Sequence, residues 1–124
     1  MADSCIFCFL DRPLIAESKL SKAFFDAFPV SNGHALIVPK RHIVTIWEAD
    51  EEEFADAFLL VRRVKDLLQQ RFSPDGFNIG LNSGKAAGQS VWHAHIHLIP
   101  RYSGDVAEPT GGVRNILPRH AHRS

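Results

Sequence analysis

Three histidines alternate with apolar residues in one short segment, and this pattern constrains the fold of the chain more than any other. Side chains of a β-strand point alternately to its two faces, so the pattern predicts a strand from Val91 to Ile99. Three adjacent imidazoles, each able to gain a proton near about pH 6.5, stabilise a fold poorly and therefore indicate a functional site. One face is expected to carry His93, His95 and His97, and the core-facing side Trp92, Ala94, Ile96 and Leu98.

Two further strands are expected before the middle of the chain. Residues 21–29 alternate around Phe24, Asp26 and Phe28, and residues 34–39 form a short apolar run. The Ser31-Asn32-Gly33 sequence between them is typical of a turn, so the two segments predict an antiparallel hairpin.

A long helix is expected after the hairpin, with Asp50 as its N-cap and Glu53 completing a capping box. Its apolar residues recur at helical spacing and should face the sheet: Phe54, Ala57, Phe58, Val61, Val64 and Leu68. A strand from Phe77 to Leu81 and a small-residue loop over 82–88 follow, and the chain beyond Arg101 should be irregular or partly disordered. Strands, helix and strands in this order predict an α+β fold with an antiparallel sheet.

Composition narrows the class of partner. The 124 residues carry 14 Lys+Arg against 14 Asp+Glu, and this neutral balance argues against nucleic-acid binding. No apolar run approaches about 20 residues and no secretory signal is recognisable, so no membrane contact is expected. Two cysteines are too few for a disulfide framework, which favours a cytoplasmic location. We expect a single domain over 1–124, with a core of about 5–104 and an irregular tail over 105–124.

The loop before the histidine segment favours chemistry on a phosphate. Gly84, Gly88 and Ser90 would bring backbone N–H groups and a hydroxyl beside the imidazoles, a combination that suits phosphate oxygens. A metal site is the other functional interpretation of the histidines, and the loop favours phosphoryl or nucleotidyl transfer.

Two segments resemble the motifs of the histidine triad (HIT) family. Gly88-Gln89-Ser90-Val91-Trp92-His93-Ala94-His95-Ile96-His97-Leu98-Ile99 is similar to its signature, and Asn32-Gly33-His34 through His42 to its second motif. The resemblance implies a HIT-like fold, with about five antiparallel strands, one long helix and a short N-terminal helix or turn. It also implies a homodimer and a nucleotide hydrolase that forms a covalent nucleotidyl-histidine on a purine substrate.

The resemblance also implies roles for individual residues. His95 would be the nucleophile, while His97 and Ser90 would bind the phosphate. His34 would orient the triad. The other expected ligand contacts are Asp26 for the ribose, Asn82 and Gln89 as polar groups, Phe7 and Phe28 around the base, and Arg114 near the phosphate.

The two cysteines form a C-x₂-C pair, Cys5 and Cys8, with spacing suited to one zinc ion. A redox pair and two buried free thiols are the alternatives. The resemblance supplies His42 and His93 as the remaining ligands, which would make a closed, structural zinc site.

Several choices stay open at this level. Ile99-Pro100-Arg101 resembles dinucleoside polyphosphate hydrolases, whereas the zinc set resembles nucleoside phosphoramidases and bacterial members. A non-catalytic nucleotide sensor and a triad that itself chelates metal are further hypotheses. Val61 and Leu68 could form a dimer surface or cover the sheet of their own chain, and the terminal residues His120 and His122 are expected in a solvated tail.

Overall fold

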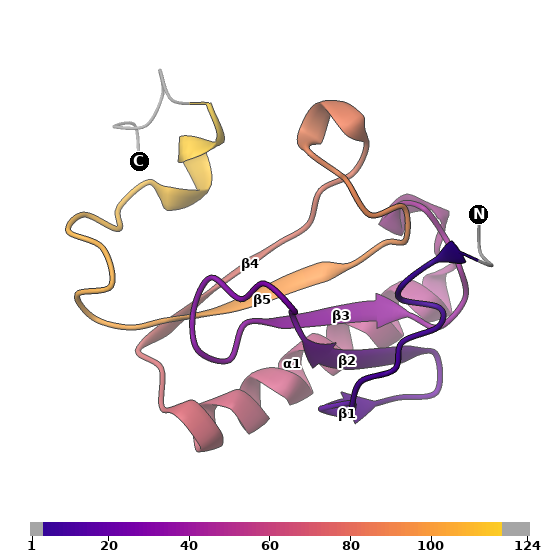
Figure 1. Ribbon diagram of the computed structural model, residues 1–124, viewed down its shortest axis with the longest axis horizontal. Coiled ribbons are helices and arrows are strands. Elements are labelled where there is room, and N and C mark those ends of the chain that lie inside the picture. Colours follow the sequence, from indigo (N-terminus) through magenta and orange to yellow (C-terminus); the bar gives the residue numbers. More distant parts are fainter. Residues whose placement is uncertain (1–3, 118–124) are drawn as a thin grey trace.

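The computed structural model describes residues 4–117, which contain a five-stranded sheet and one long helix (Figure 1). The strands pair in the order β1-β2-β3-β5-β4, and every neighbouring pair is antiparallel. Their bounds are β1 Ala16–Glu17, β2 Ser21–Phe25, β3 Ala35–Pro39, β4 Gly76–Gly80 and β5 Ile96–Arg101. The predicted α+β class is confirmed, and His120 and His122 lie outside the described residues.

The predicted hairpin is confirmed, but its first strand is shorter than expected. β2 pairs with β3 from Ser21↔Pro39 to Phe25↔Ala35. The strand does not continue to Pro29, because the Asp26 carboxylate accepts a hydrogen bond from the Phe28 backbone N–H at 2.9 Å and turns the chain. Asp26 therefore lies just beyond the strand, where its backbone N–H donates a hydrogen bond to the His34 carbonyl.

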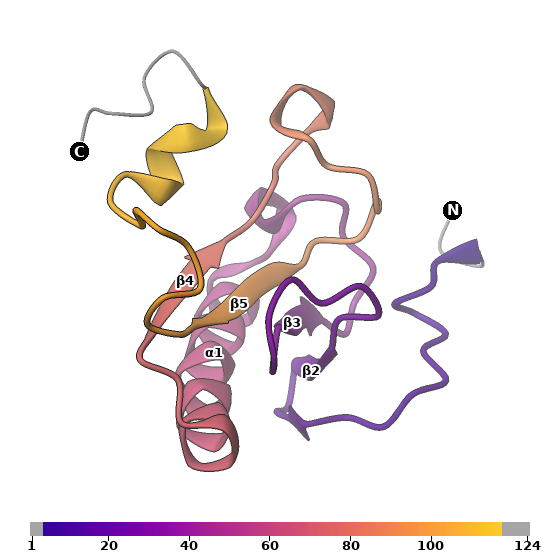
Figure 2. The ribbon, with the colours of Figure 1, turned by 60° about the vertical axis from the view of Figure 1, so that its left-hand side comes forward.

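The long helix α1 spans Glu51–Phe72 and covers one face of the sheet (Figure 2). The Asp50 side chain accepts a hydrogen bond from the Glu53 backbone N–H, and the Glu53 side chain accepts one from the Asp50 backbone N–H. The predicted capping box is therefore confirmed. The buried stripe is Glu53, Ala57, Leu60, Val61, Val64 and Leu68, whereas Phe54 is 38% exposed instead of packing on the sheet.

Val61 and Leu68 cover the sheet of their own chain, with 5% and 1% of their surfaces exposed. They pack with Ile37, Ile96 and Leu98 in a single core. Of the two alternatives that the sequence left open for Val61 and Leu68, the structure therefore supports the cover of their own sheet and not a dimer surface.

The histidine segment is a strand only in its second half. β5 begins at Ile96, and residues 91–95 are irregular, contrary to the predicted strand over 91–99. β3 ends at Pro39, and the carbonyl of Pro39 lies 2.8 Å from Nε2 of the His93 imidazole. The His93 side chain therefore takes the place of a backbone hydrogen-bond partner from a neighbouring strand. Trp92 is consequently 47% exposed and does not pack against the core as predicted.

Smaller elements connect these parts. The segment after Cys5 forms a single turn, with Phe9 N–H bonded to Cys5 O at 3.2 Å, as the expected N-terminal helix or turn. The 3-10 helices are η2 Ile46–Glu48, η3 Lys85–Ala87 and η4 Gly112–Ile116. β4 is offset by one residue from its predicted range, and beyond Arg101 the described chain has only η4 as regular structure.

No helix among residues 4–117 has the length and apolar character that a membrane span requires.

Candidate active site and metal centre

The predicted site residues gather on the sheet face opposite α1. Because neighbouring residues of β3 alternate in direction, Ile37 packs toward the helix while Leu36 and Val38 pack on the other side with Phe7 and Phe24. A cavity of about 350 Å³ opens on this second side. It is lined by residues that include Asp26, Phe28, Asn82, Ser90, His95 and His97.

His95 is held in one tautomer. Its Nδ1 lies 2.8 Å from the carbonyl oxygen of His93, and an oxygen of this kind can only accept, so Nδ1 carries the proton. The neutral ring then keeps its lone pair on Nε2. The edge of the buried Phe7 ring packs against His95 at a centroid distance of 5.2 Å, which leaves the imidazole 9% exposed and fixes its orientation.

A second chain of hydrogen bonds sets the tautomers of His34 and His97. The Val30 backbone N–H donates to His34 Nδ1 at 3.1 Å, so the His34 proton is on Nε2. That nitrogen lies 2.9 Å from His97 Nδ1 and donates to it. His97 therefore carries its proton on Nε2, where it can donate to a ligand oxygen.

Burial keeps the imidazole rings of His34 and His97 neutral near pH 7. Desolvation, and then the neighbouring imidazoles His95 and His34, lower the pKa of His97 to about 4. Burial also lowers the pKa of His34, while the nearby Asp26 carboxylate opposes the shift. Asp26 Oδ2 lies 3.4 Å from the protonated Nε2 of His34, close enough to orient that ring, and 4.0 Å from His97 Nδ1.

The small-residue loop is shaped by glycines and by Gln89. Gly84 and Gly88 have φ of +94° and +92°, a region that side chains with a Cβ rarely occupy. Gln89 is 4% exposed, accepts from Gly84 N–H at 2.9 Å and donates both amide hydrogens to the carbonyls of Val44 and Val91. The Gln89 side chain therefore holds the loop in place through backbone hydrogen bonds, whereas the sequence predicts that it contacts a nucleotide.

The two aromatic residues that the sequence predicts around a base differ in their exposure to solvent. Phe7 is buried behind the histidines, and Phe28 is 85% exposed where it lines the cavity. Arg114 lies in η4 and is not among the described residues that line this cavity. Arg12 does line it, although nothing in the sequence around Arg12 signals that role.

Cys5, Cys8, His42 and His93 form one compact cluster beside the cavity. Their ligand atoms all lie within 4.8 Å of one another, and both cysteines are free thiols. His93 Nδ1 is 3.3 Å from Cys5 Sγ and 3.5 Å from Cys8 Sγ, and His42 Nδ1 is 3.3 Å from Cys8 Sγ. Tetrahedral zinc with ordinary Zn–S and Zn–N bonds separates S from N by about 3.5 Å, so the donor set fits zinc.

The tautomer of His93 also fits a metal. Its Nε2 faces the Pro39 carbonyl at 2.8 Å and must donate to it, which leaves the Nδ1 lone pair directed at the thiols.

Asp26, His34 and His97 are a second group with ligand atoms within 4.8 Å of one another, but their protonation does not suit a metal. Binding through His34 Nε2 would require the proton on Nδ1, where the Val30 N–H already points. Among the described residues, no group of potential metal ligands contains His95 or joins His93 with His97, so the structure does not support the sequence-based hypothesis that the triad itself chelates metal.

The sequence of this chain is similar to those of known proteins. The HIT domain matches residues 10–104. An uncharacterised HIT-like protein of Mycoplasma pneumoniae is 39% identical over 105 residues, 81% of this chain and 73% of that protein. An adenosine 5′-monophosphoramidase of Schizosaccharomyces pombe is 41% identical over 103 residues, 79% of this chain and 74% of the relative. From the same yeast, an asymmetrical bis(5′-nucleosyl)-tetraphosphatase is 38% identical over 92 residues, 74% of this chain and 50% of the relative.

Solved structures agree with the fold. A HIT family protein of Bacillus anthracis superposes with a TM-score of 0.78 at 33% identity, covering 98% of this chain and 97% of its own. A zinc-bound histidine triad protein of Mycobacterium smegmatis also has a TM-score of 0.78 at 33% identity, covering 87% and 82%. The expected HIT-like architecture is confirmed.

Proposed function

The chain belongs to the HIT family, and from that premise we propose that it is a nucleotidyl hydrolase that cleaves a purine nucleotide derivative at its α-phosphate through His95. The observation that carries the proposal is the hydrogen bond from His95 Nδ1 to the His93 carbonyl. It places the proton of the neutral imidazole on Nδ1 and the lone pair on Nε2, which is the tautomer that can attack the α-phosphorus.

The reaction proceeds in two displacements at phosphorus. In the first, the His95 Nε2 lone pair forms a bond to the α-phosphorus, and the bond to the leaving group breaks with its electron pair leaving on that group. In the second, water attacks the same phosphorus, the P–N bond breaks, its electron pair returns to Nε2, and the water loses one proton to solvent. The two steps each have a lower barrier than a single direct hydrolysis.

Charge that develops on the phosphate oxygens is met by preformed donors. The pKa of His97, about 4, keeps the ring neutral near pH 7, and the hydrogen bond that its Nδ1 accepts from His34 leaves the proton on Nε2 as a donor. Ser90 lines the cavity and contributes its hydroxyl. The backbone N–H groups of Gly84, Ala87, Gly88 and Gln89 are bonded within the loop and are not offered to the phosphate, contrary to the expectation from the sequence. Asp26 accepts hydrogen bonds from the ribose hydroxyls while its second oxygen remains beside His34, and Asn82 and Phe28 contact the nucleoside at the cavity wall.

The leaving group is tested by direct assay. Both adenosine 5′-phosphoramidate and diadenosine tetraphosphate are offered to the purified protein, since relatives of both activities match it. Turnover of either, lost in His95→Ala, supports the proposal. A His95→Ala variant with full activity on the same substrate overturns it.

The Cys5, Cys8, His42 and His93 cluster is proposed to hold zinc as a structural ion. Four protein ligands leave no open coordination position, so the ion supplies cross-linking and no reactive water. It ties the N-terminal segment to the loop before β5, and a thiolate site of this kind suits a reducing compartment such as the cytoplasm. Elemental analysis of the purified protein tests the assignment, with one zinc per chain expected.

We also propose that the protein is a homodimer, as its family resemblance implies. β4 is an edge strand of the sheet, and Ile79 on it is 52% exposed. Sedimentation at several concentrations tests this proposal, and a monomer at every concentration contradicts it.

A further inference from the structure

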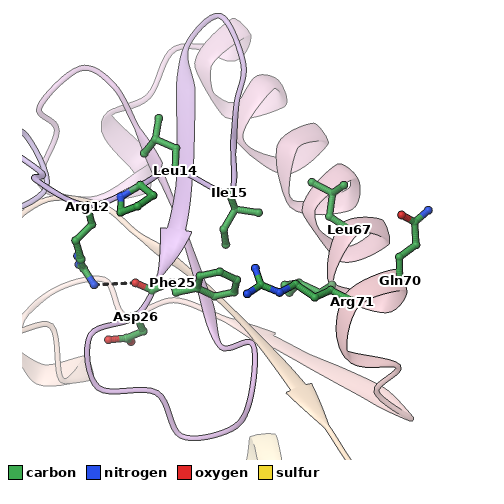
Figure 3. Close-up of a pocket in the computed structure, with 10 residues that line it drawn as sticks. Arg12, Leu14, Ile15, Phe25, Asp26, Leu67, Gln70 and Arg71 are labelled. Atoms are coloured by element: carbon green, nitrogen blue, oxygen red, sulfur yellow. Dashed lines mark hydrogen bonds between the residues drawn. The ribbon is translucent and has the colours of Figure 1, made fainter.

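A second, larger cavity lies away from the His95 imidazole, between the N-terminal segment and the end of α1 (Figure 3). Its volume of about 760 Å³ falls in the range of small-molecule sites. Its walls come from residues 12–15, from Phe25 and Asp26 at the end of β2, and from the last turns of α1.

Much of this wall is apolar. Leu14 and Leu67 face each other across the cavity, 40% and 37% exposed, with Ile15 and Phe25 between them (Figure 3). A surface of this kind favours a hydrocarbon group over water.

One cation on the wall is available to a ligand. Arg71 extends from α1 toward the Phe25 ring, with its guanidinium 5.2 Å from the centroid of Phe25 and 5.1 Å from that of Phe72 (Figure 3). Among residues 4–117, the structure shows no hydrogen bond or ion pair for this guanidinium. Stacking uses the faces of the group and leaves its N–H edge for an acceptor.

The other charged groups on the wall are engaged elsewhere. Arg12 donates to the Phe25 carbonyl at 2.8 Å and lies over the Phe24 ring. The Asp26 carboxylate accepts from Phe28 N–H and lies beside His34. The cavity therefore presents an uncompensated positive charge at one end of an apolar wall.

We propose that this cavity binds a small amphipathic carboxylic acid, with its hydrocarbon body between Leu14 and Leu67 and its carboxylate paired with Arg71. A planar guanidinium edge matches the two oxygens of one carboxylate. Neither His95 nor His97 lines the site, but Arg12 and Asp26 line both this cavity and the candidate active site.

The proposal is tested with octanoate added to the isotopically labelled full chain, followed by amide chemical shifts. Saturable shifts are expected at the amides of Leu14, Leu67 and Arg71. Octanol has the same chain without the charge, and octylamine reverses the charge, so both should bind about tenfold or more weakly. Equal binding of all three compounds would show that the cavity has no preference for an acid and would overturn the proposal.

Two variants place the effect on this wall. Arg71→Met keeps a flexible side chain against the two rings and removes the charge, so octanoate affinity should fall about tenfold. Leu14→Glu, at an exposed position on the facing wall, supplies an internal carboxylate to Arg71 and should weaken octanoate similarly. The matched control Arg62→Met, on an exposed part of the helix that does not line the cavity, should bind octanoate unchanged. Unchanged affinity in both Arg71→Met and Leu14→Glu contradicts the proposal.

Discussion

Two neighbouring histidine clusters in this protein use similar residues but are built for different ligands. Cys5, Cys8, His42 and His93 make one, and Asp26, His34 and His97 the other, each with its ligand atoms within 4.8 Å. In the first, His93 Nε2 donates to a carbonyl, so the nitrogen facing the cluster has a lone pair. In the second, His34 Nδ1 accepts from a backbone N–H, so the nitrogen facing the cluster carries a proton.

The difference shows that the partner of the remote ring nitrogen decides what an imidazole can bind. A carbonyl partner leaves the other nitrogen with a lone pair, for a metal at His93 or for an attack on phosphorus at His95, and an N–H partner prepares the ring to donate to an oxygen. Proximity of His and Asp side chains alone would have assigned both clusters to metals.

The cluster of Cys5, Cys8, His42 and His93 is connected to the proposed nucleophile, His95, by a single residue. The His93 ring belongs to the metal cluster, and its carbonyl fixes the tautomer of His95. Changes in the metal cluster should therefore reach the nucleophile, whereas changes at His34 should leave the metal in place.

The largest expected effect comes from breaking the metal cluster. Cys8→Ser should lose the bound zinc and about 3 kcal/mol or more of stability, because metal binding contributes directly to folding. Elemental analysis and chemical denaturation measure both changes. His34→Ala is the matched comparison and should retain one zinc per chain. Loss of zinc from both variants would contradict the distinction between the clusters.

His34 should matter for turnover and not for zinc. Without the His34 Nε2–H, the proton of His97 is no longer confined to Nε2, so His34→Ala should reduce kcat about 100-fold. The nitrogen chemical shifts of His97 should report a mixture of tautomers. His34→Gln keeps an N–H donor and should recover part of the loss, whereas equal defects in the two variants would argue for simple disruption of the fold.

Zinc removal should lower turnover less, by about tenfold, by loosening the His93 carbonyl that orients His95. The chelated protein must first be shown to remain folded, by its circular dichroism. The nitrogen shifts of His95 should then show a mixed tautomer, and added zinc should restore the shifts and the rate together. Full activity and an unchanged His95 tautomer in folded, metal-free protein would show that the metal cluster is not coupled to His95.

The smallest effect is on pH-dependent stability. The pKa of His97 is about 4 in the folded state against an ordinary value of 6.5. Between these values the unfolded chain holds more protons than the folded one, so stability falls as the pH drops from 6.5 to 4. Denaturation midpoints of wild type and His97→Gln should diverge in this window, with the variant less sensitive to pH. Parallel curves would contradict the buried, neutral state of His97.

The sequence was sufficient for features set by local pattern. The turn at Asn32-Gly33, the Asp50 capping box and the alternation of Ile96, His97 and Leu98 all depend on neighbours in the chain. The pairing of Cys5 with Cys8 also followed from spacing, whereas His42 and His93 entered through family resemblance.

The features that were missed depend on contacts between distant segments. Trp92 could not be placed because the ladder stops where the His93 ring reaches the Pro39 carbonyl. The sequence predicts a ligand contact for Gln89, because the three backbone groups that bond its amide come from the fold and cannot be recognised in the sequence. Arg12 was missed for the same reason, since only folding brings it to the cavity.

The most direct test of the central claim is the mass of the protein quenched in acid-free denaturant during turnover. The account predicts a transient adduct of one nucleoside monophosphate, located on His95 by peptide analysis and absent from His95→Ala. The same measurement is made on His97→Gln. Product formation without an adduct in both proteins, or an adduct on another residue, would contradict nucleophilic catalysis by His95. Nucleotide binding with neither adduct nor product would instead identify the protein as a sensor.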